Sequence, residues 1–543
     1  MTNARSLVLG SAIVCVVAAS TNLAAAQPPD PAPRFRETVF LDTDSAATKK
    51  LGALQEYLSS RQWGEAVQLA NQILEQHGGK LIAAGTGRYI DLRTRCHALL
   101  ATMDAEGLQT LRQQIDPQAR QWLEDGLANH DEAPLRKIVQ LAFLSSYGDD
   151  ALAALGEIAF QRGAYGDARG YWEMTLPLEP AAAAGEAWTV LTYPDTDRDR
   201  AELRARLVLC SLFQRDLPRF ESELAAFKQR HADAEGKLAG QTGRLADILQ
   251  NLAEQAKKWP QATSDSGMTT FAGNASRNSV LGEAIDDIGA VQWSRPLKPV
   301  TPTDLPRRAG LARPIYLSYF PIVVGDILFV NDDTTISAFD LLTGKPAWAG
   351  PDSDDAVIYR TLRPIGNPDG AVRAGIPRYT MTAYGSRLYA RMGSPVTGRT
   401  DVDPLTRSDS HLVCLDVAAG QGKTVWTVEA GEIAQQKGSW EFEGSPVVAD
   451  GKVYAALRNS SPQPQANVAC FDAEDGRLLW NRKVCTFLAS GENVEEVSHQ
   501  LLTLGEGTLF YSTNQGAIAA LDVHDGMINW VVTYERRPQR PWT

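Results

Sequence analysis

One short pattern recurs four times in the second half of this 543-residue chain. Each copy has an aspartate at the end of an apolar run, a glycine four residues later, and a tryptophan beyond that glycine. The copies are Asp340, Gly344 and Trp348; Asp416, Gly420 and Trp426; Asp472, Gly476 and Trp480; and Asp522, Gly526 and Trp530. The tryptophan follows the glycine by four residues in three copies, which indicates a repeated structural unit.

Each copy can be interpreted as a turn between two β-strands. The aspartate accepts hydrogen bonds from backbone amides of the turn, the glycine supplies the positive φ, and the tryptophan packs against a neighbouring unit. A hairpin signal precedes every copy, at Gly325-Asp326, Gly385-Ser386, Asp450-Gly451 and Glu506-Gly507. Two hairpin strands and two motif strands predict one four-stranded sheet per copy.

The pattern resembles the pyrroloquinoline-quinone-type (PQQ-like) repeat of β-propeller proteins, in which each four-stranded sheet is a blade. The resemblance covers residues 259–534, and the residues around Phe271-Ala272-Gly273-Asn274 and Trp293 are similar to the segment that leads into such propellers. It implies an all-β PQQ-like propeller over residues 291–543, preceded by a linker and lead-in segment over residues 259–290.

The number of copies leaves the ring unfinished. Propellers of this type close with about seven or eight blades, whereas four motif-bearing units are present before Thr543. We therefore expect an apparently incomplete propeller of about four blades, with self-association through its open edge as one hypothesis. Three explanations stay open: truncation of a longer gene product, which is favoured, eroded blades within residues 295–320 and 351–380, or completion by a partner.

The first half of the chain has a different periodicity. Apolar residues recur at helical spacing over residues 46–258. Three stretches share a design of two helices joined by a short turn, namely Leu51–His77, Leu152–Pro180 and Leu203–His231. The middle stretch best resembles a tetratricopeptide repeat (TPR). We expect an all-α, TPR-like helical-repeat solenoid over residues 46–258, with an irregular helical bundle as the alternative.

The first residues predict export. The apolar run Leu7–Ala19 is shorter than the roughly 18 residues that a membrane-spanning helix needs, and Ala24 and Ala26 suit signal peptidase. We expect a signal peptide over residues 1–26 and a disordered linker over residues 27–45. The mature protein is then located in the periplasm or cell envelope, or is secreted.

Charge and cysteine content exclude several function classes. Lys and Arg total 53 against 65 Asp and Glu, a net charge of −12, so nucleic acid is not expected as a partner. No later stretch predicts a transmembrane segment. The cysteines form no CxxC pair and the seven histidines form no HxH or HExxH motif, so no metal ion and no cofactor are predicted.

One acidic cluster imitates a calcium loop. Asp195, Asp197 and Asp199 have the spacing at which an EF-hand begins, but arginines stand where the loop needs glycine and glutamate. The favoured interpretation is the N-terminus of a helix. No catalytic, cofactor-binding or metal-ligating residue is assigned, and the twelve repeat residues are assigned structural roles.

Two functions from different classes remain. The first is an exported, non-enzymatic binding or scaffold protein that binds protein or peptide partners through helical-repeat and propeller surfaces, as the resemblance to the propeller lipoprotein of outer-membrane assembly suggests. The insertions Arg391–Ser410 and Asn459–Ala466 are predicted to project from one propeller face and shape the contact region.

The alternative is a PQQ-dependent quinoprotein dehydrogenase-like oxidoreductase. The resemblance implies, for such enzymes, a disulfide between adjacent cysteines beside the cofactor and a calcium ion. No two cysteines of this chain are adjacent. An enzyme is therefore the less favoured interpretation.

Overall fold

The computed structural model describes residues 39–176, 191–259, 269–279, 289–297, 319–332, 334–349, 353–361, 379–393, 410–433, 440–459, 464–487, 501–513 and 515–535. The predicted signal peptide lies outside these residues. The predicted linker overlaps them at its end, where the structure differs from the expectation: Val39–Phe40 form strand β1 and helix α1 begins at Ser45. None of the described helices is both long and apolar enough to cross a bilayer.

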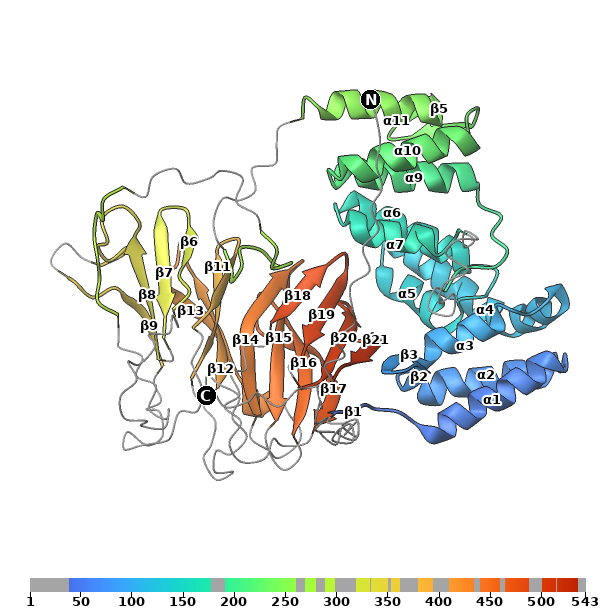
Figure 1. Ribbon diagram of the computed structural model, residues 1–543, viewed down its shortest axis with the longest axis horizontal. Helices are drawn as coiled ribbons and strands as arrows, with labels where there is room; N and C mark the ends of the chain where they lie inside the picture. The colour runs from blue at the N-terminus through green and yellow to red at the C-terminus, as the bar shows by residue number, and fades with distance from the viewer. Residues whose placement is uncertain are drawn as a thin grey trace, which may run out of the picture. The chain divides into compact units, whose positions relative to one another are not determined.

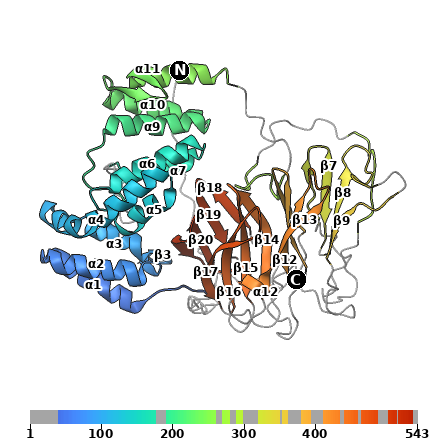
Figure 2. The same cartoon turned by 180° about the vertical axis from the view of Figure 1, so that it is seen from behind.

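The N-terminal region is helical, as its periodicity predicts, and its helices stack in chain order (Figures 1 and 2). Aspartates at several N-termini cap the free backbone amides, as Asp104 does for Gly107 at 3.0 Å. The helices are α1 (Ser45–Ser59), α2 (Trp63–His77), α3 (Leu92–Leu100), α4 (Ala105–Asn129), α5 (Glu132–Leu141), α6 (Gly148–Gln161), α7 (Tyr165–Glu173), α9 (Arg200–Phe213), α10 (Leu217–Arg230) and α11 (Leu245–Ala256).

The all-α prediction for residues 46–258 is wrong in two places. Strands β2 (Leu81–Gly85) and β3 (Arg88–Asp91) form a hairpin between α2 and α3, and strands β4 (Glu235–Leu238) and β5 (Gln241–Arg244) form another between α10 and α11. We call α1–α3 with β2–β3 the first hairpin unit, and α9–α11 with β4–β5 the second hairpin unit.

The two hairpin units are built alike. Three pairs of residues occupy matching places in the two units, and the two members of every pair are the same number of positions apart in the sequence. The pairs are Lys50 and Arg204, Arg61 and Arg215, and His77 and His231. In each unit the cation of the first helix lies close to Nε2 of the histidine, at 3.1 and 2.9 Å, and the arginine between the helices has a positive φ, 54° and 59°. The first residue of the helix after each hairpin donates its amide to the residue before the hairpin, at 2.8 and 2.9 Å.

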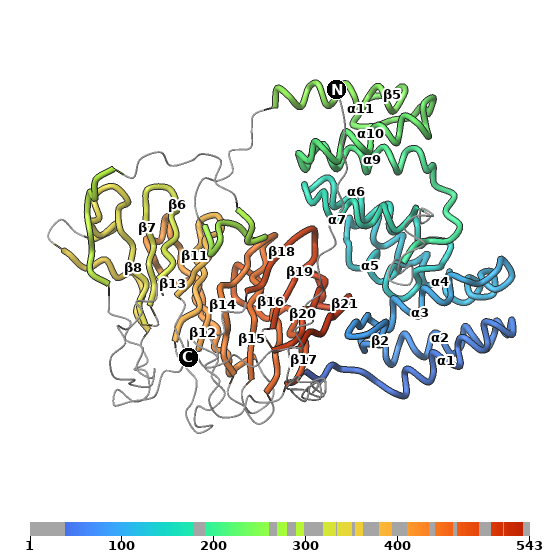
Figure 3. The backbone as a smooth tube through the Cα atoms, viewed as in Figure 1, coloured from blue at the N-terminus to red at the C-terminus, as the bar shows by residue number. Residues whose placement is uncertain are grey.

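The C-terminal region contains four antiparallel sheets whose strands follow chain order (Figure 3). The first sheet has β6 (Ile322–Val324), β7 (Ile327–Asn331), β8 (Thr335–Asp340) and β9 (Val357–Arg360); the second has β10 (Met381–Tyr384), β11 (Arg387–Met392), β12 (His411–Asp416) and β13 (Lys423–Glu429). The third has β14 (Trp440–Ala449), β15 (Lys452–Asn459), β16 (Gln465–Asp472) and β17 (Leu478–Phe487); the fourth has β18 (Leu502–Gly505), β19 (Thr508–Ser512), β20 (Ala517–Asp522) and β21 (Ile528–Thr533). The predicted hairpin turns join the first two strands of each sheet.

Strands from the N-terminal region extend two of these sheets. β1 pairs antiparallel with β17, and β3 pairs antiparallel with β21, which gives a five-stranded and a six-stranded sheet. Thr533 donates its amide to the Gly87 carbonyl at 2.7 Å, and Tyr89 lies opposite Val531. Because hydrogen-bonded pairs alternate along an antiparallel ladder, Tyr89 and Val531 form the next such pair.

The fourth sheet also contacts helix α5 through its motif turn. Gln140 donates to the Asp525 carboxylate at 2.7 Å, and Arg136 Nη2 lies 2.7 Å from His524 Nε2. Burial, together with the Arg136 and Lys452 cations, lowers the pKa of His524 to about 2. The imidazole is therefore neutral in the folded protein and is compatible with its cationic neighbours.

Removing one backbone donor tests the junction between β3 and β21. Tyr89→Pro deletes the amide that pairs with Val531, and we expect faster hydrogen exchange at the β21 amides because the hairpin detaches from that edge. The measurement is hydrogen exchange with mass spectrometry on the peptide that contains β21. Thr242→Pro, at the matching place of the second hairpin unit, should leave β21 protected, and equal exposure in both variants would contradict the pairing.

Candidate functional site

The repeat aspartates and glycines build the same turn in the first, third and fourth sheets. Each aspartate Oδ1 accepts a backbone amide of its turn, at 2.7, 2.9 and 2.7 Å, and each aspartate carbonyl accepts the amide of the repeat glycine at 2.9–3.0 Å. The glycines have φ of 65°, 76° and 70°. Only glycine adopts this left-handed conformation without strain. The residues are Asp340 and Gly344, Asp472 and Gly476, and Asp522 and Gly526.

The second sheet closes its turn differently. Asp416 accepts the Ala418 amide at 3.0 Å, but the glycine with positive φ is Gly422, at 90°, and its amide donates to the Asp416 carbonyl at 2.6 Å. A side chain on Gly420 would contact Asp416 itself. Two additional residues therefore move the left-handed position from Gly420 to Gly422.

Tryptophans join one sheet to the next at these turns. A Cβ on Gly476 would lie 2.8 Å from the ring of Trp426, and a Cβ on Gly526 would lie 2.5 Å from the ring of Trp480. The Trp426 indole also donates to the Ala473 carbonyl of the following turn at 3.1 Å. Each of these rings thus lies directly on the glycine of the next sheet, in space that no side chain could share.

The other repeat tryptophans are placed differently. In the first sheet the ring against the glycine is that of Trp293, whose indole donates to the Leu341 carbonyl at 2.9 Å. Trp348 precedes β9 and does not lie on that strand. The residue that lies against Gly422 of the second sheet is therefore Ile358, which belongs to β9. Trp530 lies on β21 opposite Ile90 of β3, with its ring 6.1 Å from that of Phe510.

A pair of matched substitutions tests the contact between ring and glycine. Gly526→Ala should lower the free energy of unfolding by about 1 kcal/mol through its positive φ and by roughly 1–3 kcal/mol more through overlap with Trp480. Gly451 has the same φ of 70°, but a Cβ on it would meet no atom within 4 Å. Gly451→Ala should therefore lower the free energy of unfolding only by the part that comes from the positive φ. Thermal unfolding measures both, and equal losses would contradict the packing role.

The lead-in segment, residues 269–279, contacts the first strand of three of the sheets. Thr270 pairs with Thr382 of β10, and Arg277 donates to the carbonyls of Leu502 on β18 and Ser445 on β14, each at 3.3 Å. Burial lowers the pKa of Arg277 to about 10, and the guanidinium stays charged at neutral pH. Residues 269–279 therefore connect three sheets rather than only linking two regions.

The two ends of the repeat sheets differ in character. At one end, the turn end, the motif turn and hairpin turn of a sheet bond to each other, as Ala473 does to Gly451 at 2.9 Å. The opposite end, the loop end, carries the connections from β11 to β12 and from β15 to β16, whose flanking pairs are Met392 with His411 and Asn459 with Gln465. Both predicted insertions thus start from the loop end, although residues 394–409 and 460–463 lie outside the described residues.

Four charged side chains are buried near the loop end. Arg391, Glu441, Glu443 and Arg458 are between 0 and 8% exposed and come from β11, β14 and β15. Arg458 Nη1 lies 3.5 Å from Glu443 Oε1, and its guanidinium lies 5.1 Å from the centre of the Phe487 ring. We call these four residues the loop-end cluster. The pair of Arg458 with Glu443 limits the cost of burying these two side chains.

Glu441 holds its proton more tightly than an exposed glutamate. Burial raises its pKa to about 8, against the partial opposition of the Arg458 and Arg391 cations, and the Glu443 charge raises it further. At neutral pH Glu441 is therefore largely protonated. A titratable acid in this range can hold or release a proton, but such a shift also accompanies purely structural charge networks.

The raised pKa of Glu441 predicts a stability that depends on pH. The unfolded chain ionises this group above its usual pKa of 4.5 while the folded protein keeps it protonated up to about 8. Stability should therefore decrease from pH 4.5 to pH 8, by at most about 1.4 kcal/mol per pH unit from this group. Glu441→Gln should remove that part of the decrease in unfolding experiments between pH 5 and 8. Glu474→Gln, at an exposed turn, is the control, and an unchanged pH profile in Glu441→Gln would refute the assignment.

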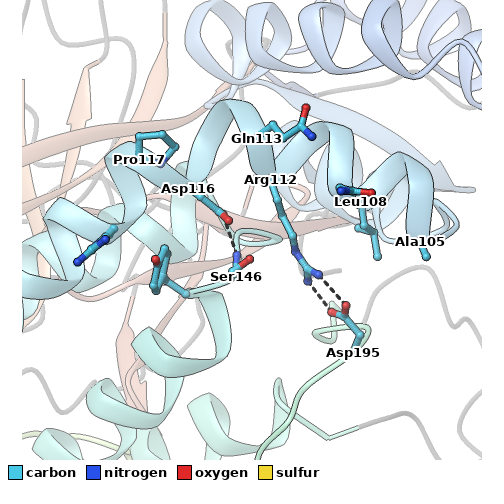
Figure 4. A pocket seen from close by; sticks show the side chains of 11 residues that line it. Ala105, Leu108, Arg112, Gln113, Asp116, Pro117, Ser146 and Asp195 are labelled. Atoms are coloured by element: carbon cyan, nitrogen blue, oxygen red, sulfur yellow. Dashed lines mark hydrogen bonds and ion pairs between the residues drawn. The ribbon is translucent and has the colours of Figure 1, made fainter.

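The helical region contains a polar groove of about 750 Å³ along α4 (Figure 4). Arg112 donates to both carboxylate oxygens of Asp195 at 2.6 and 2.7 Å, and Asp116 accepts the Ser146 amide at 2.9 Å. Pro117 lies inside α4 and removes one helical hydrogen bond at the groove. The groove presents a paired arginine rather than a free charge.

The acidic cluster of Asp195, Asp197 and Asp199, which has the spacing of a calcium loop, has other roles in the structure. Asp195 binds Arg112, and Asp199 caps α9 by accepting the Ala201 amide at 2.8 Å. The interpretation as a helix N-terminus is confirmed. No group of three or more metal-ligating side chains occurs within the part of the chain that the structure describes.

The comparisons with known proteins concern the C-terminal region. Residues 408–541 match the family model of the outer membrane protein assembly factor BamB. BamB of Moranella endobia (strain PCIT) is 23% identical over 236 residues, which cover 40% of this chain and 54% of that protein. The chain thus spans about half the length of this curated relative. The C-terminal region contains a BamB-type repeat domain and fits a PQQ-like β-propeller.

Solved structures give weaker similarities. Quinohemoprotein alcohol dehydrogenase from Comamonas testosteroni is 18% identical with a TM-score of 0.27, over 39% of this chain and 34% of that one. BamB from Moraxella catarrhalis is 16% identical with a TM-score of 0.19, over 39% of this chain and 62% of that one. At these values the similarities carry no conclusion about function.

The loop-end cluster is the feature that sequence reasoning missed. Its signal was present, because Trp440-Glu441-Phe442-Glu443 alternates apolar and acidic residues, and Arg391 and Arg458 interrupt strands that are otherwise apolar. Alternation of this kind ordinarily marks a strand with one solvent-exposed face. Here both faces are covered, since the neighbouring sheets and connections enclose the acidic face as well.

Proposed function

We propose that this protein is an exported, non-enzymatic scaffold of the cell envelope that binds partner proteins at the loop end of its repeat sheets. The observation that carries the proposal is the division of the sheets between two ends. The helical region contacts the turn end of the fourth sheet and the outer strands β17 and β21. The loop end carries the strand ends that flank both insertions, Met392 with His411 and Asn459 with Gln465, and the buried loop-end cluster lies on these strands and on β14.

The similarity to BamB supports the same proposal. The name of that relative describes a factor in the assembly of outer membrane proteins, and the matched residues 408–541 include strands β12 and β13 of the second sheet and the whole of the third and fourth sheets. Our proposal therefore takes the partner to be a protein of that assembly process. Its location would be the periplasmic side of the cell envelope, with residues 1–26 as the signal peptide.

The finer architecture belongs to the same proposal. We take α6 and α7 as a TPR-like pair, because a Cβ on Gly156 would lie 2.3 Å from Trp172 Nε1 and only a small residue permits this approach of the helices. We take the four repeat sheets as propeller blades of a ring that is apparently incomplete within residues 291–543. The outer strands and the indole contacts support this interpretation.

No specific observation favours the quinoprotein alternative. Such an enzyme would need two adjacent cysteines, and this chain has no such pair. The five cysteines after the predicted cleavage site are all buried and form no disulfide. Burial raises the pKa of the Cys414 thiol to about 11 and that of Cys470 to about 12, so both stay protonated. The residues present do not fit the cofactor site that the resemblance implies.

Site-specific photo-crosslinking tests the proposed surface. A photoreactive residue at Arg360, exposed at the loop-end terminus of β9, should crosslink in the native cell to a protein of outer membrane assembly, identified by mass spectrometry. The matched position is Lys345, exposed in the motif turn of the same sheet, which should give a crosslink yield at least about tenfold lower because it lies at the opposite end of the sheet.

A variant in which both insertions are shortened is the second part of the crosslinking experiment. Replacing residues 394–409 and 460–463 with glycine-serine connectors should abolish the Arg360 crosslink while the thermal unfolding midpoint stays unchanged. A crosslink that persists in the shortened protein, or one that forms equally from Lys345, would overturn the assignment of the loop end.

A further inference from the structure

The first hairpin unit shows what its hairpin does in this molecule. Strand β3 adds to the outer strand of a repeat sheet, with Ile90 opposite Trp530, Tyr89 opposite Val531 and Arg88 opposite Val532. Main-chain hydrogen bonds of this kind depend little on the side chains involved, so a preformed hairpin edge is a general receptor for an extended strand.

The second hairpin unit offers the matching edge. β4 and β5 close around Ala239-Gly240, with φ of 48° and 76°, and the closing pair is Leu238 with Gln241. A two-residue loop of this type makes its closing pair a hydrogen-bonded one, so the next pair, Lys237 with Thr242, points its backbone groups outward. Counted back from the helix that follows each hairpin, Thr242 corresponds to Tyr89, the residue that pairs with Val531.

The hairpin of β4 and β5 packs on the helices of its unit and leaves residues of β5 exposed. Leu238 is 4% exposed in the core formed with α9 and α11, and a Cβ on Gly236 would lie 3.2 Å from the Leu245 side chain. Along β5 itself, Thr242 and Arg244 are exposed. Among the described residues β4 and β5 form a sheet of only two strands. A preformed hairpin with an exposed residue on an edge strand that has one strand partner can accept a second strand without reorganising.

We propose that β5 binds an extended β-strand of another protein by antiparallel strand addition, as β3 binds β21. The strand it fits resembles β21, Ile-Asn-Trp-Val-Val-Thr, with β-branched and aromatic residues that favour extended structure. A second copy of this chain is the poorer source, because its own β21 is already paired with its β3. This surface lies in the helical region and is additional to the loop end of the proposed function.

Peptide binding to the full chain tests the proposal directly. The probe is a fluorescein-labelled peptide with the sequence of residues 528–534. The control is a second labelled peptide of the same sequence with proline in place of Val531. Fluorescence anisotropy should show saturable binding of the first peptide and at least about tenfold weaker binding of the second, a loss of roughly 1.4 kcal/mol.

Two proline variants locate the binding edge. Thr242→Pro removes an outward amide of β5 without breaking a bond within the hairpin, and it should weaken peptide binding about tenfold or more. Lys237→Pro makes the same change on β4, at the opposite edge, and should bind the peptide as the unaltered protein does. Equal thermal midpoints in the three proteins show that both variants fold.

Three outcomes would overturn the proposal. They are the absence of saturable binding, equal weakening by Thr242→Pro and Lys237→Pro, and concentration-dependent self-association in sedimentation experiments that Thr242→Pro abolishes. The last outcome would identify a second copy as the occupant. Each of these is independent of crosslinking at Arg360, so the two proposals can fail separately.

Discussion

The repeat region depends on one contact, an indole ring placed on a glycine of the next sheet. Trp426 and Trp480 occupy the space that a side chain at Gly476 or Gly526 would need, and the same glycines have the positive φ that closes each turn. One residue therefore meets two constraints at once, a backbone conformation and a contact surface. Because the contact recurs between sheets, it fixes their spacing as well as the shape of each turn.

Much of this could be predicted from the chain. The spacing of Asp472, Gly476 and Trp480 encodes a turn, and local chemistry is sufficient to specify it. The departure at Gly420 could not be predicted from spacing, since either glycine of the second repeat can follow Asp416 within a turn. In the folded protein Gly422 takes the positive φ and lies against Ile358, a residue of the preceding sheet.

The hairpins and the charged cluster lie beyond local rules for different reasons. Leu81-Ile82-Ala83-Ala84 has helix-compatible composition, but Leu81, Ile82 and Ala83 pair with β3, and β3 pairs in turn with β21, more than four hundred positions away. The secondary structure of that segment therefore depends on tertiary contacts as well as on its own residues. Glu441 and Glu443 follow an alternation that normally marks a solvent-exposed face, and only the enclosing sheets turn it into an interior. The recurrence from Lys50, Arg61 and His77 to Arg204, Arg215 and His231 was visible in the sequence and would have revealed the duplication.

The pairing of β3 with β21 has a consequence for synthesis. β3 ends at Asp91 and its partner begins at Ile528, so the hairpin leaves the ribosome long before the strand that covers it exists. At roughly 5–20 residues per second, this interval lasts on the order of half a minute or longer. During that time the hairpin edge is open to any strand nearby, including that of a neighbouring nascent chain. The order of the chain therefore leaves the β3 edge unpaired until the last strand of the fourth sheet has been made.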